Sequence, residues 1–196
     1  MNNQKASNTE TLIEKGNFLI AEPFAQDDIF KQSIILIADH SNQDGTVGFI
    51  INKKLQDVTI SDLINDLEDV NLPVYIGGPV NTDSLYFIHS IQDFVDDSIP
   101  IFGKIHWGGR FEQIKGLAKA GYLTEDNFKF FVGYTGWTAG QLREEISNRY
   151  WIPSEIDEKL IFNNPRPVHS SWSHALKQKG ETFAILSEIP KFYHQN

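Results

Sequence analysis

Apolar residues along the chain fall into short runs separated by turn residues, a pattern that predicts strands with hairpin connections. Residues 33–39 (SIILIAD) and 46–52 (TVGFIIN) are rich in Ile, and the turn sequence 42–45 (NQDG) joins them as a hairpin. Further strands are predicted at 17–21, at 74–76 and 85–89 as a second pair, and at 99–107, 128–134, 150–152 and 182–186.

Segments with helical spacing of apolar residues alternate with these strands. We expect helices at 60–67, 111–120, 138–148 and around 172–180. Thr59 and Asp62 have capping-box spacing before the first of them, and Ser7 and Glu10 have it in an N-terminal arm or short helix, residues 1–15. The mixed order argues for a single α+β domain over residues 16–196 and against a doubly wound parallel sheet.

Residues 131–145 (FVGYTGWTAGQLREE) predict a strand, a glycine turn and a helix start. Thr138 and Gln141 have capping-box spacing, and Trp137 stands where it can pack on Leu142 as a hydrophobic staple. Such a turn offers backbone amides to a phosphate or carboxylate. A purely structural corner is the alternative, because the cap would occupy some of those amides. The glycine spacing matches neither a dinucleotide fingerprint nor a P-loop.

Paired glycines also stand at the ends of two other predicted strands. They let a backbone approach a ligand closely, which would make one shared rim, or they form tight turns of a curved sheet. The candidate ligand-binding residues are these glycines and the turn before the predicted helix, namely Gly77, Gly78, Gly108, Gly109, Gly136, Trp137, Thr138 and Gln141.

Two of the six histidines, His40 and His89, end predicted strands and are the candidates for general acid–base catalysis. A histidine that only hydrogen-bonds a backbone carbonyl is the alternative at each position. The other histidine spacings match no metal-binding motif, so we predict neither a metal nor a cofactor. Ser33 lacks the G-x-S-x-G context of a nucleophile elbow.

Composition and charge narrow the possible functional classes of the protein further. The 196 residues carry a net charge of −9 and no cysteine, and 40% of them are hydrophobic. The acidic balance without a basic cluster disfavours direct DNA binding, which relies on Lys and Arg at phosphates. The polar start of the chain lacks the apolar core of a signal peptide, and no run approaches a membrane span. We therefore expect a soluble, cytoplasmic protein.

The chain resembles the YqgE/AlgH family over roughly residues 16–180. The resemblance rests on GNFLIAEPF, DDIFKQSIILIADH, GTVGFIIN, LPVYIGGPV, DSLYFIHS, HWGGRF and FFVGYTGWTAGQL, in that order. It implies an α+β fold with a mixed, mostly antiparallel, bifurcated and barrel-like sheet surrounded by helices. It implies no settled activity, although the family often carries the label of a transcriptional regulator through a link to alginate production.

Arg110 and Arg143 stand where members of that family often carry acids, so a metal held by those carboxylates could not bind here. Three functions remain open. The preferred one is a binding or regulatory protein with a small anionic ligand or a protein partner, in which the two arginines add positive charge. The others are a regulator that contacts DNA and a hydrolase that uses His40 or His89. The sequence predicts no oligomeric state.

Overall fold

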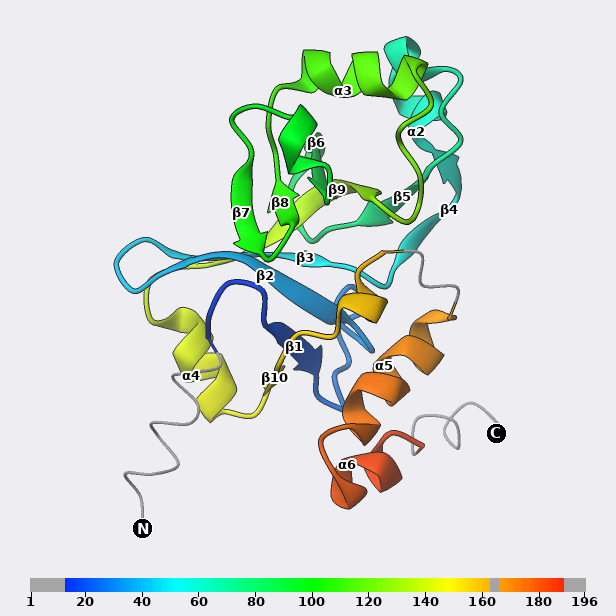
Figure 1. The fold of residues 1–196 in the computed structure, drawn as a ribbon. Helices are drawn as coiled ribbons and strands as arrows, with labels where there is room; N and C mark the ends of the chain where they lie inside the picture. Colours follow the sequence, from blue (N-terminus) through cyan, green and yellow to red (C-terminus); the bar gives the residue numbers. More distant parts are fainter. Residues whose placement is uncertain (1–12, 163–165, 189–196) are drawn as a thin grey trace.

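A mostly antiparallel sheet of ten strands organises the described residues, 13–162 and 166–188, in this computed structural model (Figure 1). The strands are β1 (Phe18–Ala21), β2 (Ile34–Ser41), β3 (Gly45–Ile50), β4 (Lys54–Thr59), β5 (Pro73–Ile76), β6 (Val80–His89), β7 (Ile99–Phe102), β8 (Ile105–Trp107), β9 (Phe128–Trp137) and β10 (Trp151–Ser154). Their main order is β10-β1-β2-β3-β9-β6-β8-β7, with β5 parallel to β9 and β4 paired to β5.

The sheet divides at β9, because β3 pairs with residues 135–137 of that strand while β5 and β6 pair with residues between 128 and 134. This arrangement confirms the α+β class and the mixed, mostly antiparallel sheet. The sheet is open, with β10 and β7 at the two ends of the main path, and is not a closed barrel. Strands β5 and β6 do not form the predicted pair, because β9 lies between them.

Helices cover both ends of this sheet (Figure 1). They are α2 (Ile60–Leu63), α3 (Phe111–Lys119), α4 (Gln141–Ser147), α5 (Val168–Lys177) and α6 (Glu181–Leu186), with short 3₁₀ turns at Asn65–Leu67, Gln92–Phe94 and Glu158–Leu160. Helix α3 lies above β6 and β9, whereas α4, α5 and α6 lie at the other end, beside β1 and β10. The arm helix suggested by Ser7 and Glu10 falls outside the described residues.

Strand β2 is buried on both faces, which explains its continuous apolar run. Ile34 and Leu36 pack into one cluster with Trp172 of α5, while Ile35 and Ile37 pack into a second cluster with Trp137. Successive strand residues point to opposite faces, so a strand covered on both sides needs apolar residues at every position. A third cluster, around Phe87 and Phe128, lies under α3.

The structure corrects two local predictions and adds one strand. Residues 182–186 form helix α6 instead of a strand, since Gly180 (φ +113°) ends one helical segment and allows the next to fold back on α5. Residues 99–107 form the hairpin of β7 and β8, which turns at Gly103 (φ +54°). Strand β4 was not predicted, because its sequence KLQDVT is polar. Three of its six residues are exposed and the other three are partly exposed.

Candidate functional site

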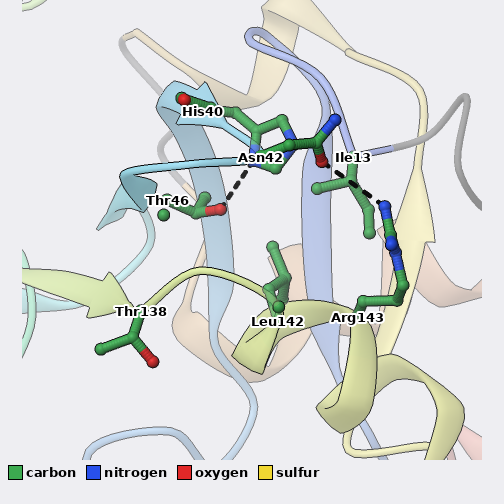
Figure 2. Close-up of a pocket in the computed structure, with 10 residues that line it drawn as sticks. Ile13, His40, Asn42, Thr46, Thr138, Leu142 and Arg143 are labelled. Carbon is green, nitrogen blue, oxygen red and sulfur yellow. Dashed lines mark hydrogen bonds between the residues drawn. The ribbon is translucent and has the colours of Figure 1, made fainter.

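Two adjoining pockets lie where the β2–β3 hairpin meets the turn between β9 and α4. The first, here called the hairpin pocket, has a volume of about 330 Å³ (Figure 2). The second, the turn pocket, has a volume of about 380 Å³ and shares Ser41, Gly45, Thr46 and Thr138 with the first. The predicted glycine turn therefore borders a cavity.

The hairpin and the turn are held together by backbone pairing. Within the hairpin, His40 pairs with Thr46, and Thr46 pairs in turn with Trp137 at the end of β9. Gly45 has φ +108°, and a Cβ there would overlap the carbonyl oxygen of Trp137. Only glycine combines that backbone angle with such a close approach, so Gly45 allows β9 to reach the hairpin tip.

Polar side chains from three elements meet in the hairpin pocket. Nδ1 of His40 lies 2.8 Å from Oγ1 of Thr46, and a guanidinium N–H of Arg143 donates to Oδ1 of Asn42 at 3.4 Å (Figure 2). Burial, aided by the positive charge of Arg143, lowers the pKa of His40, and Asp39 opposes the shift. The imidazole is thus held neutral near pH 7, within the electrostatic reach of Arg143.

Helix α4 begins later than the sequence predicts. Its N-cap is Gly140 (φ +81°) and its first residue is Gln141, so the predicted cap at Thr138 is wrong. Half of the capping box still forms, because Oε1 of Gln141 accepts from the amide of Thr138 at 3.0 Å. The Thr138 hydroxyl donates to the same oxygen at 3.2 Å, and the Thr138 carbonyl accepts from the Gln141 amide at 3.1 Å. Trp137 and Leu142 share a buried cluster, as the staple requires.

Gly77 and Gly78 allow their backbone to pass in close contact with the backbone of β9. A Cβ at Gly77 would overlap the carbonyl oxygen of Gly133, and one at Gly78 would overlap the backbone of Tyr134. Neither Gly77 nor Gly78 lines the hairpin pocket or the turn pocket, so the tight-turn interpretation describes both. Gly136, Trp137 and Gln141 do line the turn pocket, and Thr138 lines both pockets.

The structure does not bring Gly108 and Gly109 to this site. Gly108 lies beside His89, whose Nε2 is 3.1 Å from its carbonyl oxygen. His89 pairs with Phe128, whereas the hairpin tip pairs with Trp137, and these two residues are at opposite ends of β9. The predicted glycine corners therefore do not form one rim.

His89 is a core residue rather than a surface group. It is 0% exposed, its ring stacks on Phe128 with centroids 5.9 Å apart, and Nδ1 has no hydrogen-bond partner. Burial lowers the pKa of His89 to about 4, partly offset by the bond to Gly108. His89 and His40 thus lie far apart, and His40 is the one that lines the hairpin pocket.

Sequence reasoning missed two kinds of residue. Asn42 and Thr46 line the pocket but belong to turn and strand patterns that carry no chemical signal of their own. Lys129 is buried within β9, where its ammonium donates to the Ile51 carbonyl at 3.0 Å and lies 4.1 Å from the ring centre of Tyr75. Burial lowers the pKa of Lys129 to about 7. The sequence feature that could have identified this residue is a single lysine within the apolar run FKFFV, residues 128–132.

The described residues show neither a metal-binding cluster nor a membrane-spanning helix. Residues 13–162 and 166–188 contain no group of three or more His, Asp or Glu side chains placed to hold a metal ion. In the same part of the chain, every helix is too short or too polar to span a bilayer.

Comparison with known proteins gives consistent results. A family model described as AlgH-like matches residues 18–184. A UPF0301 protein of Cytophaga hutchinsonii is 35% identical over 181 residues, covering 91% of this chain and 97% of the relative. A UPF0301 protein of Chlorobium limicola is 32% identical over 179 residues, covering 91% of this chain and 94% of the relative.

Two solved structures share the fold. The solution structure of the AlgH protein of Pseudomonas aeruginosa matches with a TM-score of 0.67 and 26% identity, over 88% of this chain and 92% of that one. The crystal structure of protein DIP2367 of Corynebacterium diphtheriae matches with a TM-score of 0.73 over 89% and 91%, and at 22% identity it supports the fold alone.

Proposed function

This chain belongs to the AlgH-like family, and on that premise we propose that it is a binding protein that holds a small anion in the hairpin pocket. The anion would carry a phosphate or carboxylate group. The observation that carries the proposal is the meeting of Arg143 with His40, Asn42 and the Thr46 and Thr138 side chains around one cavity.

Arg143 would supply the charge that selects an anion. A guanidinium presents its N–H groups in a planar fork that matches a carboxylate or phosphate. The positive charge of Arg143 reaches His40, where it adds to the effect of burial in lowering the pKa, while Asp39 and Glu14 act in the opposite direction. The nearby acid Asp39 forms an ion pair with Lys15 at 3.0 Å, which offsets its charge. The Asn42 side-chain amide would add a neutral donor.

The start of α4 contributes little to this proposal. The helix has seven residues, and the turn before it already uses the amides of Thr138 and Gln141 in internal bonds. Recognition is therefore assigned to side chains, with Arg143 first. Of the two arginines that the sequence suggested, Arg110 is placed elsewhere, in an ion pair with Asp97 at 2.7 Å beside α3.

A hydrolase is the weaker alternative. The contact between His40 and Thr46 has the distance of a base and a hydroxyl nucleophile, but Thr46 is only 5% exposed. His89, the other candidate base, is enclosed in the core. A nucleophile must reach its substrate, so this geometry favours binding over catalysis.

A regulatory role would follow from the ligand-bound state of the protein and not from contact with DNA. The net charge of −9 and the lack of a basic run in the sequence both disfavour phosphate-backbone binding.

A thermal-shift screen tests the proposal. Inorganic phosphate, ribose 5-phosphate, AMP and citrate would be compared on the wild type, on Arg143→Ala and on the matched control Arg110→Ala. We expect at least one anion to raise the melting temperature of the wild type and the control but not that of Arg143→Ala. Failure of the whole panel, or an undiminished response in Arg143→Ala, would contradict the proposal.

A further inference from the structure

A third cavity lies beside α4 and shares no lining residue with the hairpin pocket. This aromatic pocket has a volume of about 340 Å³ and lies between the segment that follows β1 and the start of β10. Its side chains include four aromatic rings, Phe24, Phe30, Tyr150 and Trp151, and three carboxylates, Glu22, Asp27 and Glu145. Glu145 and Arg143 are two residues apart on α4, so they point to different faces of the helix.

The aromatic walls are partly ordered by packing and partly open to solvent. Phe30 meets Trp151 edge to face, with ring centres 5.4 Å apart. Phe24 and Tyr150 are 54% and 58% exposed, so both rings are accessible to a ligand from solvent. The amide of Glu22 donates to the Tyr150 carbonyl at 3.2 Å, which ties the two walls together.

The carboxylates give this pocket an acidic character. Within the described residues, none of the three lies within ion-pair distance of a lysine or arginine. Glu145 accepts only neutral donors, the indoles of Trp137 and Trp151 at 2.7 Å and the amide of Gln141 at 2.9 Å. Asp27 accepts from two backbone amides.

One of these acids, Asp27, interacts electrostatically with a lysine. The negative charge of Asp27 acts on Lys53, but the Lys53 ammonium donates its hydrogen bond to the Asp28 carbonyl at 2.8 Å. The pocket therefore keeps negative charge next to aromatic faces.

We propose that the aromatic pocket binds a small organic ammonium ion of the choline type. The faces of aromatic rings attract such cations, and the attraction strengthens where water is excluded. The alkyl groups would contact the exposed rings of Phe24 and Tyr150, while the carboxylates complement the charge. The volume suits a small ligand.

Titration of the tryptophan fluorescence with choline at constant ionic strength tests this inference. The neutral isostere 3,3-dimethylbutan-1-ol separates attraction for the cation from simple burial of methyl groups. We expect saturable binding of choline, with the isostere weaker by about fivefold or more. No saturation up to about 20 mM choline, or equal binding of the isostere, would overturn the proposal.

Two tyrosines of equal exposure provide a matched pair of variants. Tyr150→Ala should weaken choline binding by about threefold or more, whereas Tyr122→Ala, at a tyrosine that is 57% exposed near Phe94, should leave it unchanged. Equal effects of the two substitutions, with both variants folded by circular dichroism, would overturn the assignment. Arg143→Ala should not alter choline binding, so this test stands apart from that of the anion site.

Discussion

Trp137 and Trp151 share a single acceptor, because both indole N–H groups donate to Oε2 of Glu145 at 2.7 Å. The two rings meet edge to face with centres 5.9 Å apart, and Gln141 donates to the other carboxylate oxygen. One side chain of α4 thus connects the end of β9 with the start of β10. This junction fixes the helix that carries Arg143 into the hairpin pocket and Glu145 into the aromatic pocket.

Glu145→Ala should lower the free energy of unfolding by about 2 kcal/mol, since it leaves two buried indole donors without their acceptor. Glu144→Ala, at the exposed neighbouring position, should change it by less than about 0.5 kcal/mol. Urea unfolding followed by tryptophan fluorescence measures both. Equal stability of the two variants would show that the shared carboxylate contributes nothing.

His89 should make the protein sensitive to acid. Its pKa is about 4 in the folded state and ~6.5 in the unfolded state, so the unfolded state binds more protons between these values. Stability should fall as pH decreases from 6.5 towards 4, by roughly 3 kcal/mol for this group. His89→Leu should remove most of that slope and leave the smaller contribution of His40, whose pKa is also lowered. An unchanged slope would contradict the buried neutral state of His89.

Lys129 should also make the stability of the protein rise with pH, in the range from neutral to alkaline pH. Its folded pKa is about 7, against ~10.4 when unfolded, so stability should rise with pH between these values. The increase from pH 7 to 9.5 should be roughly 3 kcal/mol and should vanish in Lys129→Met. Chemical unfolding at several pH values gives this slope, and a parallel slope in the variant would refute the prediction.

Local sequence signals predicted the elements that depend on short-range chemistry. The turn 42–45 gave the β2–β3 hairpin, the spacing of residues 111–119 gave α3, and Thr59 with Asp62 gave the capping box of α2. Elements decided by tertiary contacts were harder to predict. Strand β4 is polar and is defined by its pairing to β5, and residues 182–186 fold as a helix against α5.

The candidate site was only partly predictable for the same reason. Thr138, Gln141 and the glycine turn do border pockets, because a strand that runs into a helix must turn there. Whether Gly108 joins them depends on which end of β9 it reaches. That relationship is set by strand order, which the glycine spacing does not encode.

Direct DNA binding should be weak and unselective at physiological salt. A protein that contacts even six phosphates shows a slope of about −5 in log affinity against log salt, and this acidic chain has no basic run to make such contacts. Fluorescence anisotropy with labelled genomic fragments measures the affinity and its salt dependence. Submicromolar, sequence-selective binding by the purified protein would favour the DNA regulator instead.

The most direct test of the anion site is a titration of the ¹⁵N-labelled protein with inorganic phosphate at constant ionic strength, followed by two-dimensional NMR. Saturable shifts should be concentrated at the Arg143 side-chain N–H and at the amides of residues 45–46 and 138–140, with the Arg110 side chain unaffected. Absence of saturable shifts, or equal responses at Arg110 and Arg143, would contradict the assignment of a small-anion site to the hairpin pocket.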